Sequence, residues 1–242
     1  LEQRVGCRAM NILAIDTCFP ALSVAVGRNV GSPVAQIVAR TEPMATGHAE
    51  RLMPLIVELL VDADLSIEQV DRLAVTVGPG SFTGTRIGIA AARALKLARG
   101  LPIVTFTSLE AIALSPHIKP GPGEDLVIAV DAHRGEAYTQ VFDGATRAAA
   151  GSPRIVGMTD LATLARGRPV LAAGTAAEAV VNAITVAGGA ARGRASMIFP
   201  DMAAAVGLAA GRNPSPSSVE PLYLRPPDAK PQDGKSLARA GV

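Results

Sequence analysis

Two aspartates and a glycine-rich turn are the residues whose types and spacing suit nucleotide chemistry. Asp16 and Asp131 each end a short apolar run, and residues 78–84 read Gly-Pro-Gly-Ser-Phe-Thr-Gly. Carboxylates can hold a hydrated metal ion, and backbone N–H groups at the start of a helix favour an anion. The predicted nucleotide or anion site consists of Asp16, Gly78, Gly80, Ser81 and Asp131.

A purely structural role for the same residues stays open. An aspartate in a hairpin turn can accept hydrogen bonds from nearby N–H groups, and a glycine turn can serve close packing. The turn is not a P-loop, because no Gly-Lys-Ser/Thr follows, and its glycine spacing differs from the dinucleotide fingerprint. A nucleotide-binding enzyme that uses Asp16, Asp131 and this turn is therefore one of two functional hypotheses.

Other catalytic arrangements find little support in the sequence. His48, His117 and His133 are dispersed, with no pair four residues apart, and Cys7 and Cys18 lack the spacing of metal ligands. No Gly-x-Ser-x-Gly motif is present. We therefore predict neither a metal site nor a catalytic triad.

Two predicted helices carry the second hypothesis, a protein-binding surface. Apolar residues recur at helical spacing over residues 48–61, and a second helix over residues 83–99 follows a Ser81 or Thr83 cap and ends at Gly100. Both flank a predicted strand over residues 73–77. If one sheet cannot cover both helices, the remaining apolar surface binds another protein.

Small residues on the second helix strengthen this hypothesis. Gly84, Gly88 and Ala92 lie four apart, so a neighbouring helix can approach closely, and the Arg86 guanidinium can pair with an anion or with a carboxylate of a partner. The predicted partner-binding residues are His48, Leu52, Leu55, Ile56, Leu59, Gly84, Arg86, Ile87, Gly88 and Ala92.

A pseudo-repeat predicts two related α/β halves. Residues 12–16 and 22–26 form one predicted hairpin, residues 127–131 and 137–141 form another, and each first strand ends in aspartate. We expect an N-terminal extension (1–9), an N-terminal domain (10–115) that carries the two helices, a C-terminal domain (116–225) and a flexible tail (226–242).

Composition limits the class of protein. Of the 242 residues, 49% are hydrophobic, which suffices for real cores, yet no apolar run of membrane-spanning length and no signal peptide is apparent. A net charge of +2 and 3% aromatic residues do not indicate a dedicated nucleic-acid surface. We therefore expect a cytoplasmic protein.

Four motifs, in order along the chain, resemble the TsaB family, also called YeaZ. They are Met-Asn-Ile-Leu-Ala-Ile-Asp-Thr at 10–17, the glycine-rich run at 78–88, Val-Asp-Ala-His-Arg-Gly-Glu-Ala-Tyr at 130–138 and Glu-Pro-Leu-Tyr-Leu-Arg at 220–225. The resemblance implies the actin/Hsp70-like ASKHA fold, with two related α/β domains and mixed sheets. It also implies the non-catalytic subunit of the complex that synthesises N6-threonylcarbamoyladenosine (t6A) at position 37 of tRNA.

The resemblance further implies partners. TsaD is the catalytic subunit and TsaE the ATPase, tRNA is met indirectly, and ATP or ADP is expected only in the complex. In the family the two N-terminal-domain helices pack against TsaD as a four-helix bundle, and homodimers use the same face. TsaD carries a His-His-x-Glu-x-His motif, where this chain has Thr-Ser-Leu-Glu-Ala-Ile at 107–112. Because Ser108 and Ile112 replace the metal-binding histidines, no enzymatic activity is expected of this chain.

Overall fold

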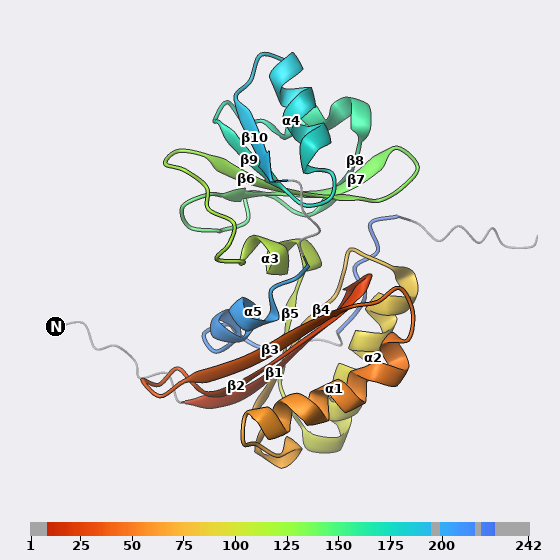
Figure 1. Cartoon of the computed structure of the whole chain (residues 1–242), viewed down its shortest axis with the longest axis vertical. Helices are drawn as coiled ribbons and strands as arrows, with labels where there is room; N and C mark the ends of the chain where they lie inside the picture. The colour runs from red at the N-terminus through yellow and green to blue at the C-terminus, as the bar shows by residue number, and fades with distance from the viewer. Residues whose placement is uncertain (1–8, 195–198, 216–218, 226–242) are drawn as a thin grey trace, which may run out of the picture.

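The computed structural model describes residues 9–194, 199–215 and 219–225 of the 242-residue chain. Figure 1 shows two lobes, each built on one five-stranded sheet, with helix α3 (Ser108–Ala113) between them. The expected tail 226–242 and the expected extension 1–9, apart from residue 9, lie outside the described residues. Within the described ranges, no helix is long and apolar enough to cross a membrane.

The first sheet is a meander followed by two parallel strands. Its strands are β1 (Met10–Phe19), β2 (Ala21–Val30), β3 (Gln36–Pro43), β4 (Arg72–Thr76) and β5 (Ile103–Phe106). They lie in the order β3-β2-β1-β4-β5, with β2 antiparallel to both neighbours, and β4 parallel to β1 and β5. Because β1 is central, both of its faces are buried, Leu13 and Ile15 on one side and Ile12 and Ala14 on the other.

The second sheet repeats this topology. Its strands are β6 (Asp125–Asp131), β7 (Glu136–Asp143), β8 (Arg154–Gly157), β9 (Val170–Ala173) and β10 (Ala191–Arg194). Counted from the edge strand of its meander, the order is β8-β7-β6-β9-β10. This order matches that of the first sheet strand for strand. The prediction of two related α/β halves is therefore confirmed. Helix α4 (Ala177–Val186) and the 3-10 helix η2 (Met158–Leu164) cover one face of this sheet.

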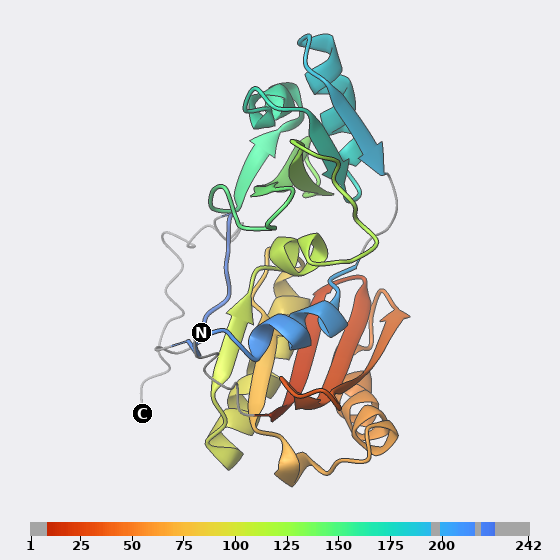
Figure 2. The ribbon, with the colours of Figure 1, turned by 90° about the vertical axis from the view of Figure 1, so that its left-hand side faces the viewer.

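Helices cover both faces of the first sheet. Helices α1 (His48–Asp62) and α2 (Phe82–Arg99) lie side by side on one face, and the short 3-10 helix η1 (Ile67–Gln69) follows α1 (Figure 1). Helix α1 matches the helix expected from apolar spacing, and α2 matches the one expected from its cap and from Gly100. The other face is covered by α5 (Met202–Ala209), as Figure 2 shows.

The position of α5 corrects the expected domain boundary. Met202, Ala205, Val206 and Ala209 pack on the alanine-rich face of β1 and β2, although they follow the second lobe in sequence. Leu222 then donates a backbone hydrogen bond to Val77 (2.7 Å). Residues 202–209, Val219 and Leu222 therefore lie on the first lobe instead of completing the second, and α5 covers the second face of the first sheet.

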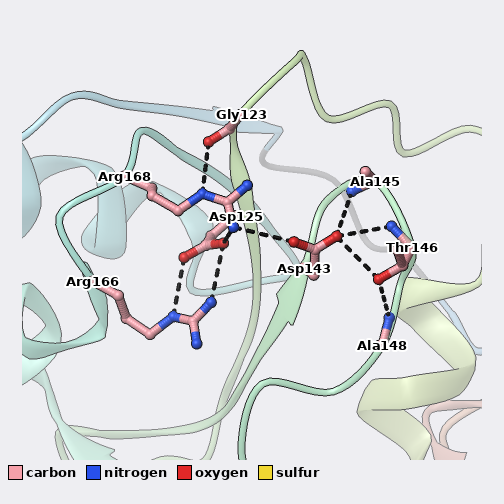
Figure 3. Close-up of polar contacts among 8 residues, drawn as sticks. All are labelled: Gly123, Asp125, Asp143, Ala145, Thr146, Ala148, Arg166 and Arg168. Atoms are coloured by element: carbon pink, nitrogen blue, oxygen red, sulfur yellow. Dashed lines mark hydrogen bonds and ion pairs between the residues drawn. The ribbon is translucent and has the colours of Figure 1, made fainter.

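A network of arginines and aspartates fixes the far end of the second sheet (Figure 3). Asp125, which opens β6 and is fully buried, pairs with Arg166 (Nε–Oδ2 3.1 Å) and Arg168 (Nη1–Oδ1 2.9 Å). Arg168 also reaches Asp143 at the end of β7 (3.1 Å). Hydrogen bonds from the Thr146 backbone and from Arg168 lower the pKa of Asp143 to about 2. These ion pairs satisfy the charge of a carboxylate that would otherwise be costly to bury.

Candidate functional site

The glycine-rich turn is packed against the chain's own first hairpin. Gly78 has a φ of +101°, which suits glycine, and Ser81 caps α2 by accepting a hydrogen bond from the Gly84 backbone (3.0 Å). The Ser81 backbone donates to the Cys18 carbonyl (2.8 Å), and a Cβ on Gly80 would lie 2.3 Å from that oxygen. The turn thus provides close packing, and the Ser81 N–H group already has a protein partner.

The small-residue stripe of α2 faces strand β1. The Thr17 hydroxyl donates to the Gly84 carbonyl (2.6 Å) and accepts from the Gly88 backbone (3.0 Å). A Cβ would lie 2.0 Å from the Thr17 carbonyl oxygen at Gly84, and 2.6 Å from the Thr17 hydroxyl at Gly88. Ala92 is buried in the same core. This corrects the assignment of Gly84, Gly88 and Ala92 to a partner surface, because the helix that approaches closely does so against its own sheet.

The apolar candidates on α1 are corrected in the same way. Leu52, Leu55, Ile56 and Leu59 are buried in the core between α1 and the first sheet. His48 is also buried, and its Nε2 atom makes a hydrogen bond with the Phe19 carbonyl (3.1 Å).

The remaining two candidates on α2, Arg86 and Ile87, differ in their exposure to solvent. Ile87 is partly buried against the core between the helices and the first sheet. Arg86 remains exposed. Of the ten predicted partner-binding residues, Arg86 is therefore the one that reaches solvent fully.

A second apolar stripe, missed by the sequence reasoning, points outward. Val57 and Val61 on α1 are 56% and 71% exposed, and Leu97 on α2 is 90% exposed. We define the outer face as Met53, Val57 and Val61 of α1 with Ala90, Ala94 and Leu97 of α2, all of which are exposed. The spacing of four between its α1 residues is a signal that could have found it.

A cavity of about 430 Å³ lies between the two lobes. It brings three predicted site residues together, Gly80 and Ser81 from the first lobe and Asp131 from the second. Asp16 and Gly78 do not line it. Aromatic and apolar side chains dominate the wall, among them Phe19 and Tyr138. The predicted nucleotide or anion site is therefore only partly assembled around this cavity.

Asp16 is sealed below the turn. Its Oδ1 accepts a hydrogen bond from the Thr76 hydroxyl (2.5 Å) and a longer one from the Cys18 backbone (3.3 Å). Its Oδ2 has no hydrogen-bond partner among the described residues. Burial raises the pKa of Asp16 to about 6, and it raises the pKa of the neighbouring Cys18 thiol as well. A carboxyl group in this setting is partly protonated near neutral pH.

We expect Asp16 to make the chain less stable as the pH rises. Its folded-state pKa of about 6 lies above the ordinary 3.8, so its contribution is fully present below about pH 4 and is lost as the pH rises through 6. Between pH 4 and pH 8, the stability of the wild type relative to Asp16→Asn should fall by about 2 kcal/mol. Urea unfolding of both proteins at several pH values measures this difference, and parallel pH profiles would contradict it.

Ser108 and Ile112, the residues expected in place of metal-binding histidines, are part of the interface between the lobes. The Ser108 hydroxyl donates to the Pro79 carbonyl, and Ile112 is buried in the core under α3. Glu110 forms an ion pair with Arg212 (2.5 Å). Thr107, the residue before α3, caps the helix by accepting a hydrogen bond from the Glu110 backbone (2.9 Å). In the described residues these side chains serve packing and the positioning of the C-terminal segment.

Two lobes with the same hairpin-and-parallel-strand topology, packed around a cavity, define an ASKHA-fold protein. A solved structure titled "YeaZ from Pseudomonas aeruginosa" superposes with a TM-score of 0.69 at 27% identity, over 89% of this chain and 100% of that one. The mixed sheets and the two related α/β domains expected from the sequence are therefore confirmed.

The chain belongs to the TsaD/TsaB (YeaZ) family. The profile described as "TsaD: tRNA N6-adenosine threonylcarbamoyltransferase" matches residues 41–199. Uncharacterized protein Rv3421c of Mycobacterium tuberculosis is 32% identical over 91% of this chain and 94% of its own length. TsaB of Escherichia coli, described as a tRNA threonylcarbamoyladenosine biosynthesis protein, is 36% identical over 129 residues.

Coverage differs among these relatives. The match spans 56% of uncharacterized protein ML0378 of Mycobacterium leprae. It spans about half the length of the TsaB proteins that match.

Proposed function

We propose that this chain is a non-catalytic subunit in the synthesis of t6A at position 37 of tRNA. In this role it binds and stabilises a TsaD-type catalytic subunit and acts together with a TsaE-type ATPase. It associates with tRNA only indirectly, through the complex, and resides in the cytoplasm. The observation that carries the proposal is the outer face of α1 and α2, which nothing else in the described chain covers.

Exposed apolar surface on two neighbouring helices supports protein binding. Large contiguous apolar patches are uncommon on monomeric proteins and usually mark an interface. A partner can bury the branched side chains of Val57 and Leu97. The small side chains of Ala90 and Ala94 let a partner helix come close to α2. The buried residues predicted from the sequence contribute indirectly, because they hold both helices rigidly against the sheet.

The residue types at positions 108 and 112 support a non-catalytic role. A serine hydroxyl that donates to a backbone carbonyl and a buried isoleucine are poor substitutes for imidazole ligands. We therefore expect the purified chain alone to transfer no threonylcarbamoyl group.

Nucleotide-dependent catalysis is a second candidate, and the cavity between the lobes is the observation that favours it. Asp131, Gly80 and Ser81 line that cavity. However, the Asp16 carboxylate does not line it, and the Ser81 N–H group is already bonded to Cys18. Calorimetry with ATP and Mg²⁺ separates the two candidates: micromolar binding with turnover supports an enzyme, and weak or absent binding supports a subunit that meets ATP or ADP only in the complex.

The proposal is tested by mixing the full-length chain with the TsaD-type protein of the same organism and separating the mixture by gel filtration. We expect co-elution at equimolar ratio, recovery of the TsaE-type ATPase in a pull-down with ATP, and transfer activity only in fractions that contain the TsaD-type protein. The chain alone is run in parallel to detect a homodimer. Separate elution of the two proteins at micromolar concentration, or transfer activity from the chain alone, would overturn the proposal.

A further inference from the structure

An arginine stacked on two aromatic rings lies at the start of α2. The Arg86 guanidinium carbon lies 3.7 Å from the centre of the Phe82 ring and 5.8 Å from that of Tyr223. The two rings stack on each other, with centroids 5.2 Å apart and an interplanar angle of 27°. Arg86 Nε donates a hydrogen bond to the Tyr223 hydroxyl (2.7 Å). These contacts fix the guanidinium on an exposed surface.

The aromatic partner Tyr223 comes from the C-terminal segment that returns to the first lobe. Arg93 of α2 donates to the carbonyl of the buried Val219, and Leu222 donates to the Val77 carbonyl (2.7 Å). Beyond Tyr223, Arg225 pairs with Glu136 of the second lobe. The segment is thus anchored on both sides of Tyr223, so the ring that holds Arg86 is itself held in place.

The terminal nitrogens of Arg86 are left available for a ligand. Among the described residues Arg86 forms no ion pair, and the one hydrogen bond of its side chain uses Nε. An arginine fork is suited to bidentate binding of a carboxylate, and less conformational entropy is lost when the fork is already oriented.

Position and charge indicate what binds there. Phe82 and Arg86 continue the exposed α2 stripe that runs through Ala90 and Ala94, so the arginine lies at one end of the outer face. Helix α2 also carries Arg93, Lys96 and Arg99 and has no acidic residue. A helix that packs along α2 is therefore complementary when it presents carboxylates.

We propose that Arg86, positioned by Phe82 and Tyr223, receives an aspartate or glutamate side chain of the catalytic partner, and that the C-terminal segment is thereby part of the docking site. This inference rests on the proposed function and specifies the chemistry of the partner's surface. Arg86 is the binding residue, and Phe82 and Tyr223 are positioning residues.

An RNA phosphate is the competing anion. The carboxylate is favoured because both aromatic rings are already stacked on each other and on Arg86, which leaves them poorly placed to stack with bases. The cluster also continues the exposed apolar stripe of Ala90 and Ala94, which a partner helix can bury and a phosphate chain would leave uncovered.

The test measures the affinity of the full-length chain for the TsaD-type protein by calorimetry at several salt concentrations. We expect Arg86→Ala to weaken binding by about 30-fold or more and to reduce its salt dependence. Arg86→Lys should recover only part of the loss, because it lacks the fork. Tyr223→Phe keeps the stacked ring but removes the hydroxyl, and a loss of about 3- to 10-fold is expected. Circular dichroism and urea midpoints confirm that each variant folds.

A charge exchange identifies the partner group. Arg86→Glu should bind weakly to the wild-type partner and regain affinity for one partner variant in which an acidic residue of its docking helices is replaced by arginine. Failure of every such variant to restore binding, or wild-type affinity of Arg86→Ala, would overturn the inference. So would a loss of tRNA affinity with unchanged partner affinity. If Arg86→Ala binds normally while charges on the outer face abolish binding, the proposed function stands and this inference fails.

Discussion

Replacing Val57 and Leu97 together by glutamate should abolish the complex with the TsaD-type subunit while leaving the fold intact. Both side chains are more than half exposed, and neither belongs to the core between the helices and the first sheet. In a complex, each glutamate would place an unpaired carboxylate inside an apolar interface, which is costly. We expect the affinity to fall roughly 100-fold or more for the pair, as for central interface residues.

Val186→Glu is the matched control for this experiment. Val186 ends α4 in the second lobe and is also 90% exposed, so the same chemical change is made on a different surface. Gel filtration and calorimetry with the partner compare the two variants, and urea midpoints exclude unfolding. Binding of the double variant at wild-type strength would show that the partner docks elsewhere. Any homodimer of the wild type that the double variant loses would share the outer face.

Gly84→Ala should strongly destabilise the folded chain. A Cβ at this position would lie 2.0 Å from the Thr17 carbonyl oxygen, a backbone atom that cannot move aside without distorting β1. Gly88→Ala meets the Thr17 hydroxyl at 2.6 Å and would also break its hydrogen bonds to α2. We expect a loss of about 3 kcal/mol for Gly84→Ala and a somewhat smaller loss for Gly88→Ala, measured by urea unfolding.

Gly207→Ala should change the free energy of unfolding in the opposite direction. Gly207 lies within α5, and a Cβ there would meet nothing within 4 Å. Alanine should therefore stabilise the chain by about 0.5–1 kcal/mol, the usual helix preference over glycine. A Gly84→Ala variant that unfolds like the wild type but no longer binds its partner would show that Gly84, Gly88 and Ala92 face the partner.

Local patterns were sufficient for α1, α2 and the two hairpins, and for the two-lobed architecture. The spacing of Leu52, Leu55 and Leu59 is a property of neighbouring turns, so it predicted α1 without knowledge of what packs on it. Ser81 and Gly100, the caps of α2, are equally local signals. The two aspartate-ended hairpins predicted the repeated topology, because the strand order follows from one supersecondary unit used twice.

Local patterns could not tell which contacts serve folding and which remain for a partner. A glycine permits any close approach, and only the packing of α2 on Thr17 decides that Gly84 and Gly88 serve the fold. Likewise, the sequence places Asp16 at a turn, and only the turn packed over it decides that its carboxyl is sealed from the cavity.

The sequence by itself determined helices α1 and α2, the two hairpins, the two-lobed α/β architecture and the family resemblance, because these depend on short-range periodicity and on motifs. Only the tertiary structure decided which apolar residues of α1 and α2 remain exposed as the outer face, that α5 crosses back to the first sheet, and that Tyr223 holds Arg86. The physical reason is that burial depends on contacts between residues far apart in the chain, and a helix with apolar residues on two sides does not itself say which side the sheet will cover.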